Sequence, residues 1–320
     1  MAADASHRFT GSETGPFFIV GCPRSGTTLL QRMLDAHPDV AVAPETFFIR
    51  RFWKRRTEYG DLQRDAAFER LLRDIMAIPE FEEMELAPDA FAAAARDADR
   101  SYAALFRLLL RQFAEQRAAQ VVGEKTPNHV LYLPTLHDFF PDARFIHLVR
   151  DPRAVVNSWR SVPWSSGRAW RDAEVWVEYV AAGRAAGSLL GEALQVVHLE
   201  TLVRAPEQTL RRVCAHLALD YDPAMQAFHE RTPQTVNVER EPWKANATQP
   251  IDPSVAEQWR SALTPQQVTE VEAVAAEEML HWGYAPEQPM WRRAVTQAAL
   301  PLRRVGWKLE LVFDKWRGAA

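Results

Sequence analysis

The sequence predicts a three-layer α/β fold, in which a central parallel sheet is flanked by helices. Short apolar runs rich in β-branched and aromatic residues alternate with longer stretches of helical periodicity, which is typical of strand–helix–strand units. A loop with two glycines at phosphate-binding spacing joins the first such strand to the first helix. The chain has 320 residues, of which 47% are apolar, and this is enough for a full hydrophobic core.

Four segments are predicted to be strands of the sheet. Each is a short apolar run of the kind that parallel sheets bury on both faces. They are Phe17–Gly21, Val121–Gly123, Arg144–Val149 and Leu194–Leu199.

Helical periodicity accounts for much of the chain between and after these strands. Helices are predicted over residues 27–36, 101–117, 131–140, 153–161, 171–190, 206–217 and 264–282. Residues 47–117 carry no strand pattern, so we expect a helical insertion between the first two predicted strands.

We expect one main domain over residues 16–288, preceded by a flexible N-terminus at residues 1–15. Within that domain, residues 232–253 are rich in Pro, Asn and Thr and show little periodicity. A loop of this length is usually a functional lid or a disordered segment. The segment is therefore predicted to be a lid-like loop.

Residues 289–320 are predicted to form a basic amphipathic helical tail. Apolar residues recur from Trp291 to Trp316 at alternating spacings of four and three, and Pro301 is expected to interrupt any single helix. Two interpretations stay open. In the first, the tail docks on its own domain or on a second subunit, and docking on a second subunit would make a homo-oligomer. In the second, the tail lies on an anionic membrane surface.

Composition excludes several classes of protein. Charged residues make up 25% and the net charge is −4, which excludes disorder for most of the chain and argues against a nucleic-acid binder. Cys22 and Cys214 are too few for a disulfide framework or a four-cysteine zinc site, and we expect no metal. We see no signal-peptide pattern and no uncharged apolar run of ~18 residues, so we expect a cytoplasmic protein whose membrane contact, if present, is peripheral.

The most specific local pattern is Gly21–Thr28 (GCPRSGTT), which lies between the first strand and the first helix. Its spacing is that of a P-loop, in which backbone N–H groups and the helix dipole bind phosphate. Thr27 replaces the lysine of nucleotide kinases, and Arg24 supplies positive charge instead. The alternative is an ordinary strand–turn–helix that contains two glycines.

Pro23–Leu30 resembles the 5′-phosphosulfate-binding loop of sulfotransferases that use 3′-phosphoadenosine 5′-phosphosulfate (PAPS). The continuation to Pro44-Glu45-Thr46 is similar to the tyrosylprotein sulfotransferase branch and its bacterial relatives. Phe145–Ser158 resembles the 3′-phosphate-binding strand, loop and helix of the family, and Gly123–Pro127 and Leu199–Leu202 resemble two further blocks. The resemblance runs from about residue 16 to residue 285 and implies a P-loop-like fold and a PAPS-dependent sulfotransferase.

The resemblance also implies two anion sites for PAPS and for its product 3′-phosphoadenosine 5′-phosphate (PAP). The 5′ site would comprise Arg24, Ser25, Gly26, Thr27 and Thr28. The 3′ site would comprise Arg150 and Ser158. The alternative for Arg150 is a surface salt bridge to Asp151, and the alternative for Ser158 is that it is a helical residue with no role in binding. Further candidate contacts in the lid-like loop are Arg240 and Lys244.

In-line sulfuryl transfer needs positioning and charge stabilisation, as phosphoryl transfer does. By resemblance, Arg24 and Lys125 would stabilise charge on the leaving oxygen. Glu45 matches the catalytic base of the tyrosylprotein branch, and a carboxylate base works best when burial raises its pKa. The alternatives are that Glu45 serves the start of the helix near Phe47, and that His129 is the base.

The sequence leaves the acceptor open among a hydroxyl-bearing small molecule, a glycan, a lipid and a peptide. Phe47 replaces a basic residue with which the tyrosylprotein branch reads acidic peptides, whereas Arg51 matches another. Two alternative functions make different demands on the sequence. A P-loop ATP-dependent kinase would want lysine at position 27 and could use Asp151 for Mg²⁺, and a non-catalytic nucleotide-binding protein would be expected to lose Glu45 and Lys125.

Overall fold

The protein is described by a computed structural model that covers residues 15–231 and 241–317. Its contacts divide the chain into two compact units. Of the described residues, the first unit comprises 15–150, 179–231 and 241–253, and the second comprises 151–178 and 254–317. The boundary therefore crosses helix α10 (Ala169–Leu190) and also the span 16–288 expected as one domain.

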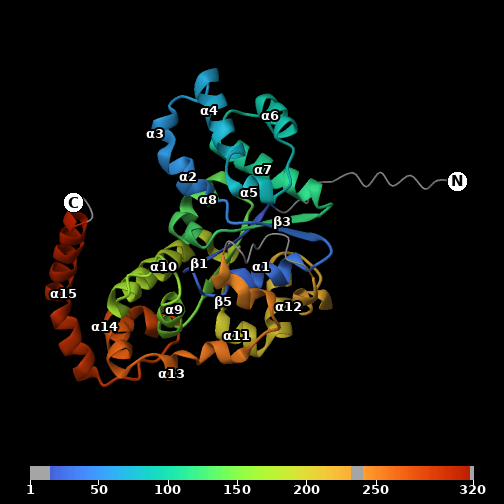
Figure 1. Cartoon of the computed structure of the whole chain (residues 1–320). Helices are drawn as coiled ribbons and strands as arrows, with labels where there is room; N and C mark the ends of the chain where they lie inside the picture. The colour runs from blue at the N-terminus through green and yellow to red at the C-terminus, as the bar shows by residue number, and fades with distance from the viewer. Residues whose placement is uncertain (1–14, 232–240, 318–320) are drawn as a thin grey trace. The chain divides into compact units, whose positions relative to one another are not determined.

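A five-stranded parallel sheet forms the centre of the first unit (Figure 1). Its order is β2-β3-β1-β4-β5, which confirms the predicted α/β class with a central parallel sheet. The strands are β1 (Phe17–Gly21), β2 (Val40–Ala43), β3 (Val121–Lys125), β4 (Arg144–Val149) and β5 (Leu194–His198). Strand β2 is additional to the four predicted strands, because two of its four residues are alanine, which has little preference for strands.

The order of the strands locates the ligand-binding edge of the sheet. Strand β1 lies in the centre, where Phe17 pairs with Gly123 of β3 on one side and with Arg144 of β4 on the other. The chain runs from β1 to β2 and β3 on one side and then returns to build β4 and β5 on the other. Parallel sheets bind ligands outside the carboxyl ends of their strands at such a reversal. The residues that follow β3, β1 and β4 are therefore the first candidates for a site.

Aromatic packing fixes helices to the sheet of the first unit. The ring of Phe18 on β1 lies 5.9 Å from Phe106 and 5.2 Å from Phe140, measured between centroids. Phe106 belongs to α7 (Tyr102–Gln116), and Phe140 follows α8 (Leu133–Phe139). Helix α1 (Thr27–Asp35) also contacts the sheet, and α11 (Leu199–Arg204) and α12 (Pro206–His216) follow β5.

Between β2 and β3 the chain is helical, and Figure 1 draws these helices close together in blue to cyan. They are α2 (Phe48–Arg51), α3 (Arg56–Tyr59), α4 (Asp65–Met76), α5 (Pro79–Glu83), α6 (Pro88–Asp97) and α7 (Tyr102–Gln116). Their buried residues recur at helical spacing, as in α4, where Phe68, Leu71, Leu72 and Ile75 are buried.

The second unit is helical. It contains α9 (Pro152–Trp159), the first part of α10, α13 (Trp259–Ala262), α14 (Pro265–His281) and α15 (Met290–Arg317). A capping box begins α14, in which the Thr264 hydroxyl accepts the N–H of Gln267 and the Gln267 side chain accepts the N–H of Thr264.

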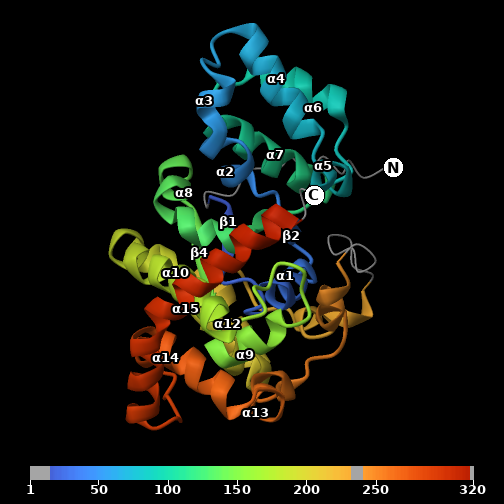
Figure 2. The same cartoon turned by 60° about the vertical axis from the view of Figure 1, so that its left-hand side comes forward.

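The expectation that Pro301 interrupts the C-terminal helix is wrong. Helix α15, red in Figure 2, is continuous through Pro301. Leu300 is buried beside the proline, and Trp307 packs on Trp170 two turns later. This packing offsets the hydrogen bond that proline removes. In residues 15–231 and 241–317, no helix has both the length and the apolarity needed to cross a bilayer.

Candidate active site

The loop between β1 and α1 has a backbone that only glycine fits at both ends. Gly26 has φ +92°, and a Cβ there would lie 2.5 Å from Cδ1 of Leu199. Gly21 has φ +151°, and its Cβ would lie 2.4 Å from the backbone oxygen of Leu148. No side chain caps α1 after this loop. The N–H groups at the start of α1 can therefore bind an anion, which the helix dipole favours.

Ser25 of this loop carries a hydroxyl that has no partner among the described residues. Its side chain is fully buried, and Oγ makes no hydrogen bond within the described residues. An unsatisfied buried hydroxyl costs about 1–3 kcal/mol. A phosphate or sulfate oxygen bound in the loop would satisfy it, so the loop fits the predicted anion.

Two arginines meet at the loop. Arg150 directly follows β4, and its Nη1 donates a hydrogen bond of 2.9 Å to the backbone oxygen of Arg24. Burial and the charge of Arg150 lower the pKa of Arg24 to about 10. Arg24 also has a φ of +71°, a strained value for a residue with a side chain. Two like charges held this close are stabilised by an anion between them.

Lys125, the last residue of β3, joins the loop to Glu45. Its Nζ lies 3.3 Å from Oγ1 of Thr28 on α1 and forms an ion pair with Glu45. Its side chain is only 1% exposed, and this burial lowers the pKa of Lys125 to about 8. The structure thus brings together four residues predicted from three segments: Arg24, Thr28, Glu45 and Lys125.

A second lysine reaches the same carboxylate from the segment after residue 240. Lys244 lies in the 3₁₀ helix Pro242–Thr248, with its Nζ 2.7 Å from Oε1 of Glu45 and 2.5 Å from Oε2 of Glu241. Burial would raise the pKa of Glu45, but Lys125 and Lys244 together lower it to about 2. The attraction of the two lysines thus exceeds the effect of burial on the pKa of Glu45. Burial alone would have raised this pKa, as a general base requires.

His129 lies in a different environment. It is fully buried, and its Nδ1 is 3.1 Å from Oε2 of Glu124. Glu124 also accepts hydrogen bonds from Thr126 and, at 2.8 Å, from the hydroxyl of Thr46, next to Glu45. This geometry favours His129 as part of a buried polar cluster that positions Glu45. The N–H of Phe48, the first residue of the helix after Phe47, donates to the Thr46 hydroxyl at 3.2 Å, so the structure gives no support to Glu45 as a capping residue.

Two carboxylates of this region were not singled out from the sequence. Glu241 could have been found from its i,i+3 spacing to Lys244. Glu124 could have been found as a charged residue inside a buried strand, where a partner is obligatory. Arg240, a predicted contact, lies outside the described residues.

Ser158, the other residue predicted for the 3′-phosphate, is half-buried on α9 in the second unit. The start of α9 is fixed by Asp151, whose Oδ1 accepts the N–H of Arg153 at 2.8 Å. Asp151 also forms a 2.7 Å ion pair with the guanidinium of Arg153. Asp151 therefore pairs with Arg153. This pairing argues against the alternative of a kinase, in which Asp151 would bind Mg²⁺.

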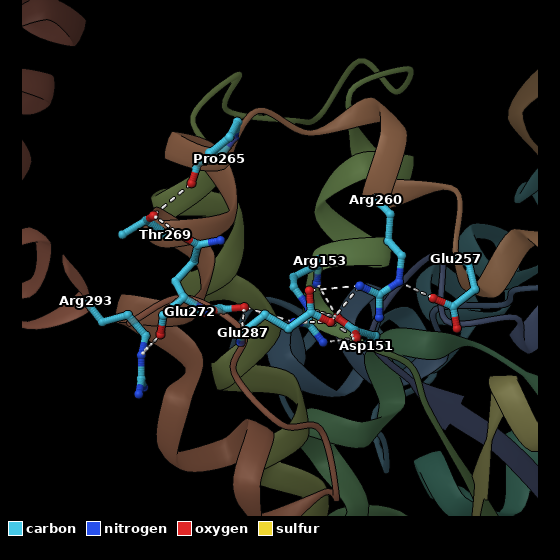
Figure 3. Close-up of polar contacts among 10 residues, drawn as sticks. Asp151, Arg153, Glu257, Arg260, Pro265, Thr269, Glu272, Glu287 and Arg293 are labelled. Carbon is cyan, nitrogen blue, oxygen red and sulfur yellow. Dashed lines mark hydrogen bonds and ion pairs between the residues drawn. The ribbon is translucent and has the colours of Figure 1, made fainter. Parts of the chain in front are cut away.

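Arg153 is the centre of a buried ion-pair network (Figure 3). Its Nη1 lies 2.9 Å from Oε1 of Glu272 on α14, and its guanidinium carbon lies 4.1 Å from the ring centroid of Trp259. Glu272 also accepts the backbone N–H groups of Glu287 and Gln288 at 2.9 and 2.7 Å. The network therefore ties the first turn of α9 to α14 and to the segment before α15.

Comparison with known proteins finds sulfotransferases among the relatives of this chain. A putative protein-tyrosine sulfotransferase of Caenorhabditis briggsae is 29% identical over 229 residues, which cover 67% of this chain and 69% of that protein. The nodulation protein NoeE of Sinorhizobium fredii is 28% identical over 301 residues, which cover 83% of this chain and 65% of NoeE. The chain thus spans about two thirds of the length of these relatives.

A solved structure has the same fold. The sulfotransferase domain of the Synechococcus PCC 7002 olefin synthase superposes with a TM-score of 0.58 at 26% identity, covering 82% of this chain and 96% of that domain. A model of the sulfotransferase family matches residues 16–223, well over half of the chain. With the phosphate loop, the parallel sheet and these matches in agreement, the chain belongs to the sulfotransferase family.

Proposed function

We propose that this protein transfers the sulfuryl group of PAPS to a hydroxyl group of an acceptor. One observation carries the proposal. Lys125 contacts Thr28, which follows the anion loop, and also Glu45, the only carboxylate expected to act as a base. The donor-binding loop and the group that would deprotonate the acceptor thus share one buried cation.

The donor site is supported by the chemistry of the residues present. The N–H groups at the start of α1, the Ser25 hydroxyl and Arg24 fit a 5′-phosphosulfate. Arg150 fits a 3′-phosphate, with Ser158 as its proposed hydroxyl partner by sequence resemblance. Arginine suits both sites because its planar guanidinium binds phosphate or sulfate through two hydrogen bonds.

The transfer step assigns one role to each charged group. PAPS supplies the activated sulfuryl group, which forms a bond to the acceptor oxygen as its bond to the 5′-phosphate oxygen breaks. Glu45 takes the proton of the acceptor hydroxyl. Lys125 and Arg24 hold positive charge where the leaving oxygen of PAP gains its electron pair.

Donor binding would also prepare the base. Lys125 and Lys244 both pair with Glu45, and their charges lower its pKa to about 2. A phosphosulfate competes for these lysines and weakens their hold on the carboxylate. The pKa of Glu45 then rises, and a base is most effective when its pKa lies near the working pH.

The acceptor is proposed as a hydroxyl compound, with peptide tyrosine as the first to test because several relatives are named protein-tyrosine sulfotransferases. Arg51, which matches a residue that reads acidic peptides, forms a 2.5 Å ion pair with Glu80. It also donates a hydrogen bond to the Thr46 backbone oxygen. An acidic peptide would therefore have to displace Glu80 to reach Arg51.

Calorimetric titration with PAP, ATP and AMP, without metal, tests the donor assignment. We expect micromolar binding of PAP that exceeds the binding of ATP and AMP at least tenfold. The affinity should fall at least tenfold in Arg150→Ala, because a charged hydrogen bond contributes about 1.5–3 kcal/mol. Arg144→Ala, at the other end of β4, is the matched control and should bind PAP normally. Preferential binding of ATP would instead favour the kinase.

A further inference from the structure

Helix α15 presents an apolar side to solvent. Apolar residues spaced by four and three lie on one side of this helix, namely Trp291, Val295, Ala298, Leu302, Val305 and Leu309. The five large ones are between 54% and 79% exposed. No charged residue interrupts this side over ~27 Å of helix. An exposed apolar stripe of this length marks an interaction surface.

The opposite side of α15 is already occupied within the second unit. Leu300 is 4% exposed, and the ring of Trp307 lies 6.2 Å from that of Trp170. Arg303 pairs with Glu270 of α14 at 2.6 Å, and Arg304 pairs with Glu174 of α10 at 2.6 Å. Docking on its own unit therefore accounts for one side of the helix and leaves the apolar side without a partner among the described residues.

The net charge of α15 indicates what kind of partner binds its apolar side. The helix carries seven Lys or Arg residues and two acidic ones, a net charge of +5, whereas the whole chain carries −4. A second copy packed on the same stripe would bring two such helices together, and their charges would repel. An anionic surface gains from the same charge, and a single convex helix side can insert between lipid headgroups without a matching groove.

We propose that α15 binds the surface of an anionic phospholipid bilayer, with its axis in the membrane plane and the stripe from Trp291 to Leu309 buried among the headgroups. Trp291 at one end suits this position, because tryptophan prefers the membrane–water boundary. This surface is separate from the residues proposed for sulfuryl transfer. The proposal therefore holds or fails independently of the enzymatic activity.

Co-sedimentation of the full-length protein with vesicles tests the proposal. Binding to phosphatidylcholine vesicles that contain phosphatidylserine should exceed binding to pure phosphatidylcholine roughly tenfold or more, and added salt should weaken it. The double variant Leu302→Ser/Leu309→Ser should reduce binding roughly tenfold or more, because two apolar contacts are lost. Leu280→Ser is the matched control, since Leu280 is 64% exposed on α14.

Three results would overturn the proposal. The first is that the protein does not pellet with the phosphatidylserine vesicles. The second is equal binding by the wild type and the double variant, whose unchanged circular dichroism would show that both are folded. The third is a dimer, seen by light scattering, that the double variant dissociates, because the stripe would then be covered by a second copy.

Discussion

At the scale of single residues, the candidate site depends on how charges are distributed around one carboxylate. Glu45 contacts two lysines, and both come from segments far from it in sequence. Their combined attraction exceeds the effect of burial on its pKa. Resemblance to the family singled out Glu45 and Lys125 in the sequence, but only the fold shows that their charges are coupled.

Lys125 gives the site a pH dependence. Its pKa of about 8 means that it loses its charge in the mildly alkaline range. We expect PAP affinity to fall about tenfold between about pH 7 and pH 9, because the neutral amine no longer attracts the 5′-phosphate. Lys125→Arg should keep its affinity over this range. Calorimetric titrations at several pH values measure this, and an equal decline in both proteins would contradict the role given to Lys125.

His147 predicts a pH dependence of stability that is unrelated to the site. It is fully buried on β4, and burial lowers its pKa to about 3. The unfolded chain binds a proton at this residue below about pH 6.5, whereas the folded chain stays neutral until about pH 3. The free energy of unfolding therefore falls with falling pH, by about 2 kcal/mol between about pH 7 and pH 5.

Urea denaturation of the wild type and of His147→Leu at both pH values isolates this effect. The substitution changes packing at either pH, so only the difference between the two pH values is compared. This difference should be smaller in His147→Leu by about 2 kcal/mol. The same pH difference in both proteins would show that His147 is not the group responsible.

At the scale of elements, the start of α9 depends on the buried network around Arg153. Glu272 is fully buried and accepts three hydrogen bonds there, one from the guanidinium and two from backbone N–H groups. Removal of one partner from a buried ion pair costs about 3–5 kcal/mol, because the other charge stays buried.

We therefore expect Glu272→Ala to lower the free energy of unfolding by about 3 kcal/mol in urea denaturation. Arg153→Met in the same background should cost less than it does alone, because its ion pair with Glu272 is already lost there. Glu277→Ala, an exposed position on α14, should be within about 0.5 kcal/mol of wild type. Additive losses in the double variant would show that the two residues are not coupled.

At the scale of the whole molecule, local patterns predicted the elements better than their arrangement. The apolar runs at Phe17–Gly21 and Arg144–Val149 gave two strands with their observed bounds, because buried parallel strands need such runs. The four residues of β2 were missed, and the order of the strands could not be read from any local pattern. Pairing between distant segments also hid the contact of Glu124 with Thr46, which lies 78 residues earlier in the chain.

The charge of the chain is unevenly distributed at this scale. The whole chain has a net charge of −4, whereas helix α15 alone has a net charge of +5. The amphipathic pattern of α15 was visible in the sequence, but which of its sides is docked was not. Only the structure shows that Leu300 is buried while Leu302 is 79% exposed.

The central claim is that the residues around Lys125 move a sulfuryl group from PAPS to a hydroxyl. The most direct test follows the conversion of PAPS to PAP by chromatography, with a tyrosine peptide, a phenol, a glycan and a lipid alcohol offered as acceptors. We predict acceptor-dependent PAP formation that falls at least a hundredfold in Glu45→Gln, as expected when a general base is removed. Glu58→Gln, an exposed carboxylate on α3, should retain full activity. PAP formation that no acceptor stimulates, or that Glu45→Gln does not reduce, would contradict the account.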